Sequence, residues 1–435
     1  MKKVNSHITK WIIGIIICIY FLQTTVFARM LEWNLRLEML FYITFLLWIP
    51  FLWNLLYTTK GEVKYILKNN WMIILYFTVR CGSLFFGDFS VDQNALETIY
   101  YEIFGLIIIG YYSLKYIDNL NSVFKVYIFL NLIINILNIF IFYAVPKGVF
   151  APEGGVVLWL TKYSSYASFP YASLYTNSNG AGILTGMAVV LAAAVFKKRK
   201  IFFWLYCTFS IYFMYLVHAR SAQVALMVCG IGYVLMQLSK KKYIIKIFVT
   251  LVFVACVCMT AGLYGVVYKN STDISKVEVM NPIEQELNQR STGRYLIWKY
   301  DINTNKLTDF WGSGSVINSQ NKRKDIFMKI YKDPVRAEQQ RRQMMAFDFH
   351  NGYLGTISVC GVFAFILFLL ILIKKVIQMD HEKTDYWLIC ACFMFVVNLF
   401  ECQFLIETYV YSIILMLVLN QQKNNYNIGN QVSDI

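Results

Sequence analysis

Three polar elements carry the side chains of this sequence that are best suited to chemistry. Arg220 lies in the run His218-Ala-Arg-Ser-Ala, Arg294 begins the run Arg-Tyr-Leu-Ile-Trp298, and His350 precedes Asn351 where a long polar segment meets an apolar one. Two guanidinium groups can hold a phosphate-rich group through charge-assisted hydrogen bonds. An imidazole can take a proton from a hydroxyl group near neutral pH. The three elements together predict a site that binds a phosphate-bearing substrate and activates a hydroxyl nucleophile.

The composition predicts that a membrane positions these residues. Hydrophobic residues make up 58% of the 435 residues and charged residues only 15%, which is too apolar for a soluble domain. Apolar runs long enough to cross a bilayer recur from end to end. We therefore predict an all-α polytopic membrane protein with about twelve transmembrane helices. The predicted spans are 11–28, 37–57, 71–87, 98–117, 123–145, 178–196, 201–217, 219–238, 243–268, 351–373, 385–404 and 405–420.

The placement of the positive charge predicts the orientation of the spans. A net charge of +15 would suggest nucleic acid as the partner of a soluble protein, but here the Lys and Arg clusters fall on alternate short connections, for example at 197–200, 240–242 and 374–375. Such clusters mark the cytoplasmic side of a membrane protein. We expect both termini to be cytoplasmic, no nucleic-acid partner, and an outer side that carries 146–177, the turn at His218 and the loop 269–350.

The chain accordingly divides into five predicted parts. Residues 1–145 form the first five helices, 146–268 an outer loop with helices six to nine, and 269–350 a large extracytoplasmic loop. The last three helices occupy 351–420, and a cytoplasmic tail occupies 421–435. The ten cysteines lie mostly within spans, with no Cys-x-x-Cys spacing. This pattern predicts neither a disulfide framework nor a zinc site, and we expect no metal.

Elimination among the four histidines favours His350 as a proton acceptor. His7 and His381 fall in predicted cytoplasmic segments, which leaves His218 and His350 on the outer side. A histidine at a membrane boundary often has only a structural, hydrogen-bonding role. His350 is the stronger candidate because the junction of a polar loop with an apolar span is accessible to water and is held in place by the span.

The two arginines each have a functional and a structural interpretation. Arg220 lies between two apolar spans, where an ionisable group is costly unless it faces a polar cavity or a partner. The alternative is an arginine that reaches lipid phosphates. Arg294 and Trp298 share a face if their segment is helical, but a solvated amphipathic helix would show the same spacing.

The order of these motifs resembles that of the O-antigen ligase and polymerase superfamily. The resemblance covers roughly residues 176–361, and the first five spans carry no matching motif. The Ser-Arg element of the family is reversed here to Arg220-Ser221. The matching elements are Thr176-Asn-Ser-Asn-Gly180, Ala219-Arg-Ser-Ala-Gln223, Arg294 to Trp298, Gly312-Ser-Gly314, and His350-Asn351 followed by Gly361.

The resemblance implies a membrane glycosyltransferase with a GT-C-like architecture and no cofactor. Its donor would be a glycan on a polyprenyl pyrophosphate, with Arg220 and Arg294 on the pyrophosphate and His350 as the base for the acceptor hydroxyl. Direct displacement would invert the anomeric carbon without a metal. The substrate-binding candidates are Asn351, Trp298, Asn177, Asn179, Arg290 and His218.

The acidic residues offer no clear metal-binding pair. Metal-dependent lipid-linked glycosyltransferases of similar architecture place an Asp/Glu-x-Asp motif in the first outer loop, where this chain offers only Glu32. We expect Glu284 and Glu286 to lie on a solvated helix face. Glu102, Glu401 and Glu407 fall within or near spans, where each could line the cavity or pair with an arginine, and the sequence alone does not rank them.

Three functions remain open at this point. The first is a polymerase that joins lipid-linked oligosaccharide repeats into a capsular or O-antigen-type chain on the outer face of a bacterial cytoplasmic membrane, working with the bilayer, a flippase and a chain-length regulator. The second is a ligase that transfers the finished glycan to an acceptor. The third is a flippase, for which Arg80 would be the best candidate for a charge near the membrane midplane.

Overall fold

Helices make up most of the part of the chain that the structure describes. The computed structural model describes residues 2–25, 48–49, 52, 71–82, 99–100, 102–103, 120–144, 174–175, 178–196, 199–239, 243–270, 281–291, 294–304, 310–315, 318–319, 349–379, 381–401, 404 and 410–419. Its helices are α1 (Lys2–Gln23), α7 (Leu120–Ala144), α9 (Ser178–Val195), α10 (Lys200–Val217), α11 (Arg220–Leu238), α12 (Tyr243–Asn270), α13 (Pro282–Arg290), α14 (Arg294–Thr304), α17 (Gly352–Gln378), α18 (His381–Val397) and α19 (Val410–Leu419).

Several of these helices can cross a membrane, which makes the chain a multi-pass membrane protein. Among the described residues, six helices are long and apolar enough, namely α9 to α12, α17, and Asn121–Tyr143 within α7. Lys10–Ile19, Trp71–Gly82 and Asp385–Val397 are shorter apolar helices that coincide with further predicted spans. The predicted spans 37–57 and 98–117 lie almost wholly outside the described residues, so the total of about twelve stays a prediction.

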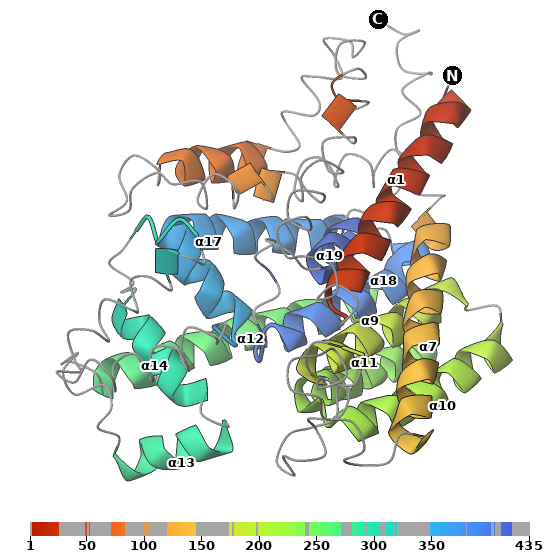
Figure 1. The fold of residues 1–435 in the computed structure, drawn as a ribbon. Coiled ribbons are helices and arrows are strands. Elements are labelled where there is room, and N and C mark those ends of the chain that lie inside the picture. Colours follow the sequence, from red (N-terminus) through yellow and green to blue (C-terminus); the bar gives the residue numbers. More distant parts are fainter. Residues whose placement is uncertain are drawn as a thin grey trace, which may run out of the picture.

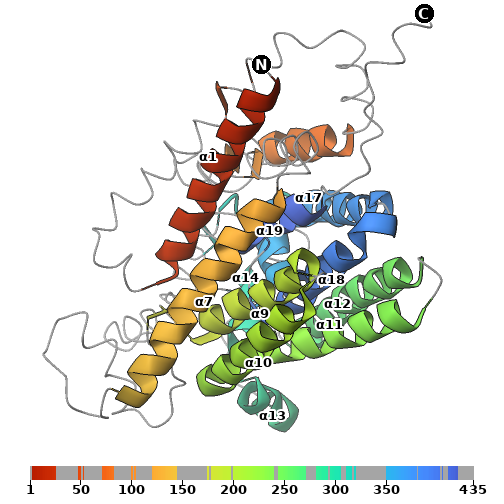
Figure 2. The same ribbon diagram turned by 90° about the vertical axis from the view of Figure 1, so that its right-hand side faces the viewer.

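The centre of the bundle is formed by α9 and α18, as Figures 1 and 2 show. Residues 388–397 of α18 are buried on every side of the helix, and α18 packs against α9, α11, α12 and α19. The outer helices α10, α11 and α12 instead expose large apolar side chains, including Trp204, Met227 and Leu251. Apolar surface of this kind is unfavourable in water and is expected on helices that face lipid tails.

Small residues bring α9 close to its neighbours. A side chain at Gly182 would collide with Ala219 in the turn between α10 and α11, and a Cβ at Gly186 would lie 2.5 Å from the ring of Phe393 in α18. Gly182 and Gly186 are four residues apart, the spacing that lets membrane helices approach one another closely. The Asn/Gly-rich start of α9 is thereby held against both the α10–α11 turn and α18.

The turn at residues 310–315 packs against a break in α17. Gly361 has φ 78° and ψ 169°, which interrupts the helix, and Figure 1 shows α17 as two segments at an angle. The break removes the helical donors for the carbonyls of Ser358 and Val359. The Ser313 N–H donates to Ser358 O at 2.8 Å, and the Gly314 N–H donates to Val359 O at 2.9 Å. Non-helical backbone at membrane depth is tolerated where protein groups satisfy it in this way.

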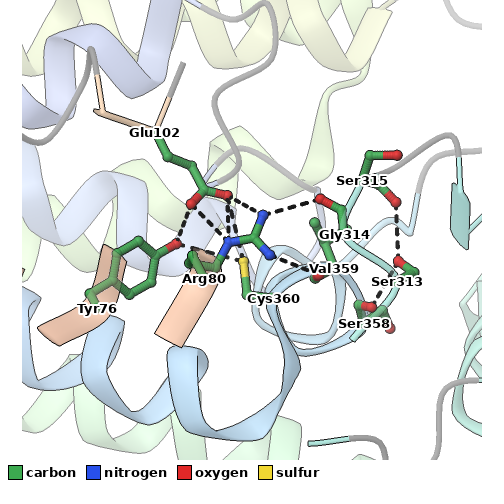
Figure 3. A network of polar contacts seen from close by, with 9 residues as sticks. All are labelled: Tyr76, Arg80, Glu102, Ser313, Gly314, Ser315, Ser358, Val359 and Cys360. Carbon is green, nitrogen blue, oxygen red and sulfur yellow. Dashed lines mark hydrogen bonds and ion pairs between the residues drawn. The ribbon is translucent and has the colours of Figure 1, made fainter. Parts of the chain in front are cut away.

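A buried ion pair also contacts the backbone at this break (Figure 3). The guanidinium of Arg80 contacts the carboxylate of Glu102 at 2.8 Å, and their side chains are 0% and 2% exposed. Arg80 also donates to the carbonyls of Gly314 at 3.1 Å and Val359 at 3.4 Å. Tyr76 donates to Glu102 at 2.8 Å. Gly312-Ser-Gly314 and Gly361 therefore meet at one contact. There, Arg80 and the turn donate hydrogen bonds to carbonyls that lose their helical partners at the break.

Candidate functional site

The site is organised by the four residues that follow α18. The Asn398 carbonyl accepts the N–H of Gly352 at 2.7 Å, and the Leu399 carbonyl accepts the side-chain amide of Asn351 at 3.2 Å. The Phe400 carbonyl and the Glu401 carboxylate both accept hydrogen bonds from Arg294, at 2.8 and 2.7 Å. This segment, residues 398–401, therefore joins the start of α17 to the start of α14.

Glu401 is the common partner of three residues that the sequence singles out separately. Its Oε1 accepts hydrogen bonds from Arg294 at 2.7 Å and from the Asn179 amide at 2.9 Å. Its Oε2 lies 3.1 Å from Nδ1 of His350. We call Asn179, Arg294, His350 and Glu401 the Glu401 cluster. These residues come from α9, α14, the segment before α17 and the segment after α18.

The backbone around His350 fixes where its ring lies. His350 has φ 49°, in the left-handed region that residues other than glycine rarely adopt. On one side of it, the Phe349 carbonyl accepts the indole N–H of Trp298 at 3.0 Å. On the other side, Asn351 caps α17 by accepting the Leu354 N–H at 3.0 Å. Trp298 and Asn351, both predicted to bind substrate, thus hold the backbone that carries the histidine.

The third residue of the run His350-Asn351-Gly352 has to be glycine for a steric reason. A side chain there would collide with Oδ1 of Asn398, so only glycine permits the close approach of α17 to the 398–401 segment.

Arg294 is positioned by the packing of α14 against the membrane helices. Tyr295 and Ile302 of α14 lie in one buried cluster with Tyr264 of α12 and Leu354 of α17, and Trp298 packs against that cluster. The start of α14 is thus held beside the start of α17. Because of this packing, Arg294 reaches Glu401 from a helix that is distant in the sequence.

A second carboxylate supports α14 from α13. Asn281 and Glu284 form a reciprocal capping box at the start of α13, with Pro282 as the first helical residue. Glu284 also accepts hydrogen bonds from Tyr295 at 2.9 Å and contacts Lys299 at 3.0 Å. The predicted solvated face is correct for Glu286, which is exposed, but wrong for Glu284, which is buried because it pairs with Lys299.

The pKa of Glu284 lies below its usual value. Burial by itself would raise the pKa of this carboxyl group, but the hydrogen bonds from the Asn281 backbone, Lys299 and Tyr295 outweigh burial. Glu284 is therefore ionised where it joins α13 to α14.

Arg220 and His218 lie at the turn between α10 and α11, next to the cluster but without a described bond to it. His218 ends α10 with φ 52°, is exposed, and has its ring 5.9 Å from that of Tyr215. Arg220 begins α11 and is exposed. The intervening Ala219 packs against Gly182, three residues beyond Asn179 on the same side of α9. The contact between α9 and the turn therefore brings Arg220 into the neighbourhood of Asn179.

Two further candidates lie outside this arrangement. The side chain of Arg290 is 76% exposed and pairs with Glu286 on the surface of α13. Asn177 lies outside the described residues.

The residue that sequence reasoning did not single out is Glu401. The available signal was an ionisable residue at the end of an apolar run, and such residues are usually paired or functional. Glu102 and Glu407 gave the same signal, and no spacing in the sequence connects residue 401 with residues 179, 294 and 350.

The cluster combines groups that can bind an anion and accept a proton. Arg294 supplies a guanidinium that is partly exposed, at 18%, and a second guanidinium, that of Arg220, starts α11 after the turn that packs against α9. When Nδ1 of His350 donates to Glu401, the ring lone pair lies on Nε2, which is the nitrogen that can take a proton.

Comparison with known proteins gives a family match that overlaps the site. Residues 205–369 match the family model described as O-Antigen ligase, and this match supports the resemblance to the O-antigen ligase and polymerase superfamily. The matched segment contains Arg220, Arg294 and His350, whereas Asn179 and Glu401 lie outside it. No curated protein and no solved structure matched the chain.

Proposed function

We propose that this protein is an inverting, metal-independent membrane glycosyltransferase that polymerises polyprenyl-pyrophosphate-linked oligosaccharide repeats on the outer face of a bacterial cytoplasmic membrane. The family match supports a glycosyl-transferring activity of the O-antigen ligase or polymerase type on lipid-linked glycans. The observation that carries the proposal is the Glu401 cluster, which unites Arg294 and His350 beside the turn that bears Arg220.

In the proposed reaction, the acceptor hydroxyl oxygen attacks the anomeric carbon of the donor as the bond to the pyrophosphate oxygen breaks. His350 takes the hydroxyl proton on Nε2, and the negative charge that develops on the leaving pyrophosphate is stabilised by Arg220 and Arg294. Attack from the face opposite the leaving group inverts the anomeric configuration. The pyrophosphate is already a good leaving group, so positive charge from guanidinium groups can take the place of a metal ion.

The choice of polymerase over ligase follows from where the resemblance ends. The family match begins at residue 205, and polymerases diverge from one another most strongly outside the shared motifs. The description of the matched family favours the ligase as the second candidate. A polymerase would work with a flippase that supplies repeats and a regulator of chain length.

The test is a transfer assay in reconstituted membranes with the lipid-linked oligosaccharide that accumulates in cells lacking this protein. We expect His350→Ala to abolish transfer while the donor stays bound, and His218→Ala to retain it. Loss of transfer in the His218 variant alone would reverse the assignment of the base. Products that grow by repeat units on the polyprenyl carrier support the polymerase, whereas transfer of a single finished glycan to lipid A core identifies a ligase.

A further inference from the structure

We propose that Glu401 is a positioning residue that fixes the tautomer of His350 and links it to Arg294. This inference rests on the proposed function, because it assigns His350 the role of general base. Glu401 itself falls outside the segment that matches the family.

The hydrogen bonds of the carboxylate argue for positioning rather than for direct proton transfer. Oε1 is engaged by Arg294 and Asn179, and Oε2 is engaged by His350. The Glu401 side chain is 9% exposed, whereas that of His350 is 17% exposed. Both carboxylate oxygens are thus already engaged within the cluster. The imidazole is the more accessible of the two groups and the better placed to meet a hydroxyl.

The geometry also selects one tautomer of His350. A carboxylate only accepts hydrogen bonds, so the Nδ1 atom that faces Glu401 carries the hydrogen and Nε2 carries the lone pair. The left-handed backbone at His350 and the hydrogen bond from Trp298 to Phe349 O set the direction of the ring. Carboxylate–imidazole pairs of this kind hold the ring in place and stabilise the imidazolium that forms on proton transfer.

The same carboxylate links the ring to the rest of the cluster. Arg294 from α14 and Asn179 from α9 both donate to Oε1, while Oε2 faces Nδ1 of His350. The carboxylate is therefore held by two other elements where it meets the ring.

The experiment compares Glu401→Gln, which keeps the shape and loses the charge, with Glu401→Asp, which keeps the charge. We expect Glu401→Gln to lower kcat by about 100-fold or more with little change in the KM for the lipid-linked donor. Glu401→Asp should recover part of the rate. Glu286→Gln, an exposed glutamate on α13, is the matched control.

A second measurement tests the tautomer without any turnover. The chain has only four histidines, so ¹⁵N-histidine labelling and loss of one signal in His350→Ala identify this ring. We expect a hydrogen on Nδ1 in the wild-type protein at neutral pH. A hydrogen on Nε2 alone would overturn the proposal, even if Glu401→Gln fails to accumulate in the membrane.

The outcomes separate the two proposals. If His350→Ala transfers normally, the proposed function is wrong in its choice of base. If His350→Ala is inactive but Glu401→Gln keeps the wild-type rate, the positioning role alone is wrong. A parallel loss of protein and of donor binding in both Glu401 variants would assign Glu401 a merely structural role and overturn the proposal.

Discussion

Arg80 and Glu102 form an ion pair that is closed off from solvent and that holds the break in α17. The guanidinium contacts both carboxylate oxygens, at 2.8 and 3.0 Å, and donates to the carbonyls of Gly314 and Val359 (Figure 3). Arg80 was the residue on which the flippase interpretation depended. Its carboxylate and carbonyl partners give Arg80 a structural role. Its charge is therefore no longer an argument for the flippase interpretation.

Breaking this ion pair should destabilise the protein strongly. Glu102→Gln leaves the Arg80 charge buried without its counter-ion, and removal of one partner of a buried pair costs about 3 to 5 kcal/mol. We expect a large fall in the thermal unfolding midpoint in detergent. The double variant Arg80→Met/Glu102→Leu should unfold at a higher temperature than either single variant. Equal midpoints for Glu102→Gln and the wild type would contradict this account of the ion pair.

Gly361→Ala tests the break in α17 directly. The backbone has φ 78° there, and a Cβ would lie 2.6 Å from the carbonyl carbon of Trp311. Strain and overpacking together should cost about 2 to 5 kcal/mol and reduce the amount of folded protein in the membrane. Gly262→Ala in α12 is the control, because a Cβ there meets nothing within 4 Å. The prediction fails if both substitutions leave the unfolding midpoint unchanged.

The arginines should matter for the rate of transfer rather than for folding. Arg220→Ala and Arg294→Ala should each lower transfer by about 100- to 1000-fold, because each removes a contact to the charge that develops on the pyrophosphate. Lysine should restore activity only in part, since it cannot make the bidentate contact. The measurement is polymer formed per unit of protein, with Arg199→Ala at the other end of α10 as the control. Full-length polymer from both alanine variants at normal expression would refute a pyrophosphate clamp.

Glu284 should stabilise the α13–α14 pair in a pH-dependent way. Because the pKa of this carboxyl is lowered in the folded protein, its stabilising effect is complete above the unfolded value of about 4.3 and is lost as the pH falls through the folded pKa. Glu284→Gln should therefore increase amide hydrogen exchange in α13 and α14 at pH 7. The difference from the wild type should shrink once the pH falls below the folded pKa. A difference of constant size over that range would show that the charge of Glu284 is not responsible.

The sequence predicted the helical class and several residues of the candidate site, but not how these residues meet. The helices α9 to α12 and α17 begin and end within a few residues of their predicted spans, because each apolar run is bounded by polar residues. Gly312, Gly314 and Gly361 were recognised from the family pattern, although the backbone conformation of Gly361 was not predicted. Their contact was not predicted either, because it depends on the buried Arg80, which lies far away in the sequence.

Glu401 shows the same limit within the site. Hydropathy identifies a carboxylate near the end of a span, but the pairing of that carboxylate with residues 179, 294 and 350 depends on how α9, α14, α17 and α18 pack together. Trp298 and Asn351 were recognised as important by their motifs. Hydrogen bonds to backbone groups, which a sequence does not reveal, give both a role in holding the His350 backbone.

The segment 398–401 sets a constraint on length as well as on residue type. Each of its four consecutive residues accepts a hydrogen bond from a donor at the start of α14 or α17, and three of these contacts are made by backbone carbonyls that any amino acid provides. Insertion or deletion of one residue would turn the following carbonyls away from their donors and move Glu401 out of contact with His350. Related sequences can therefore vary in composition at residues 399 and 400, whereas the number of residues between the end of α18 and the glutamate must stay fixed.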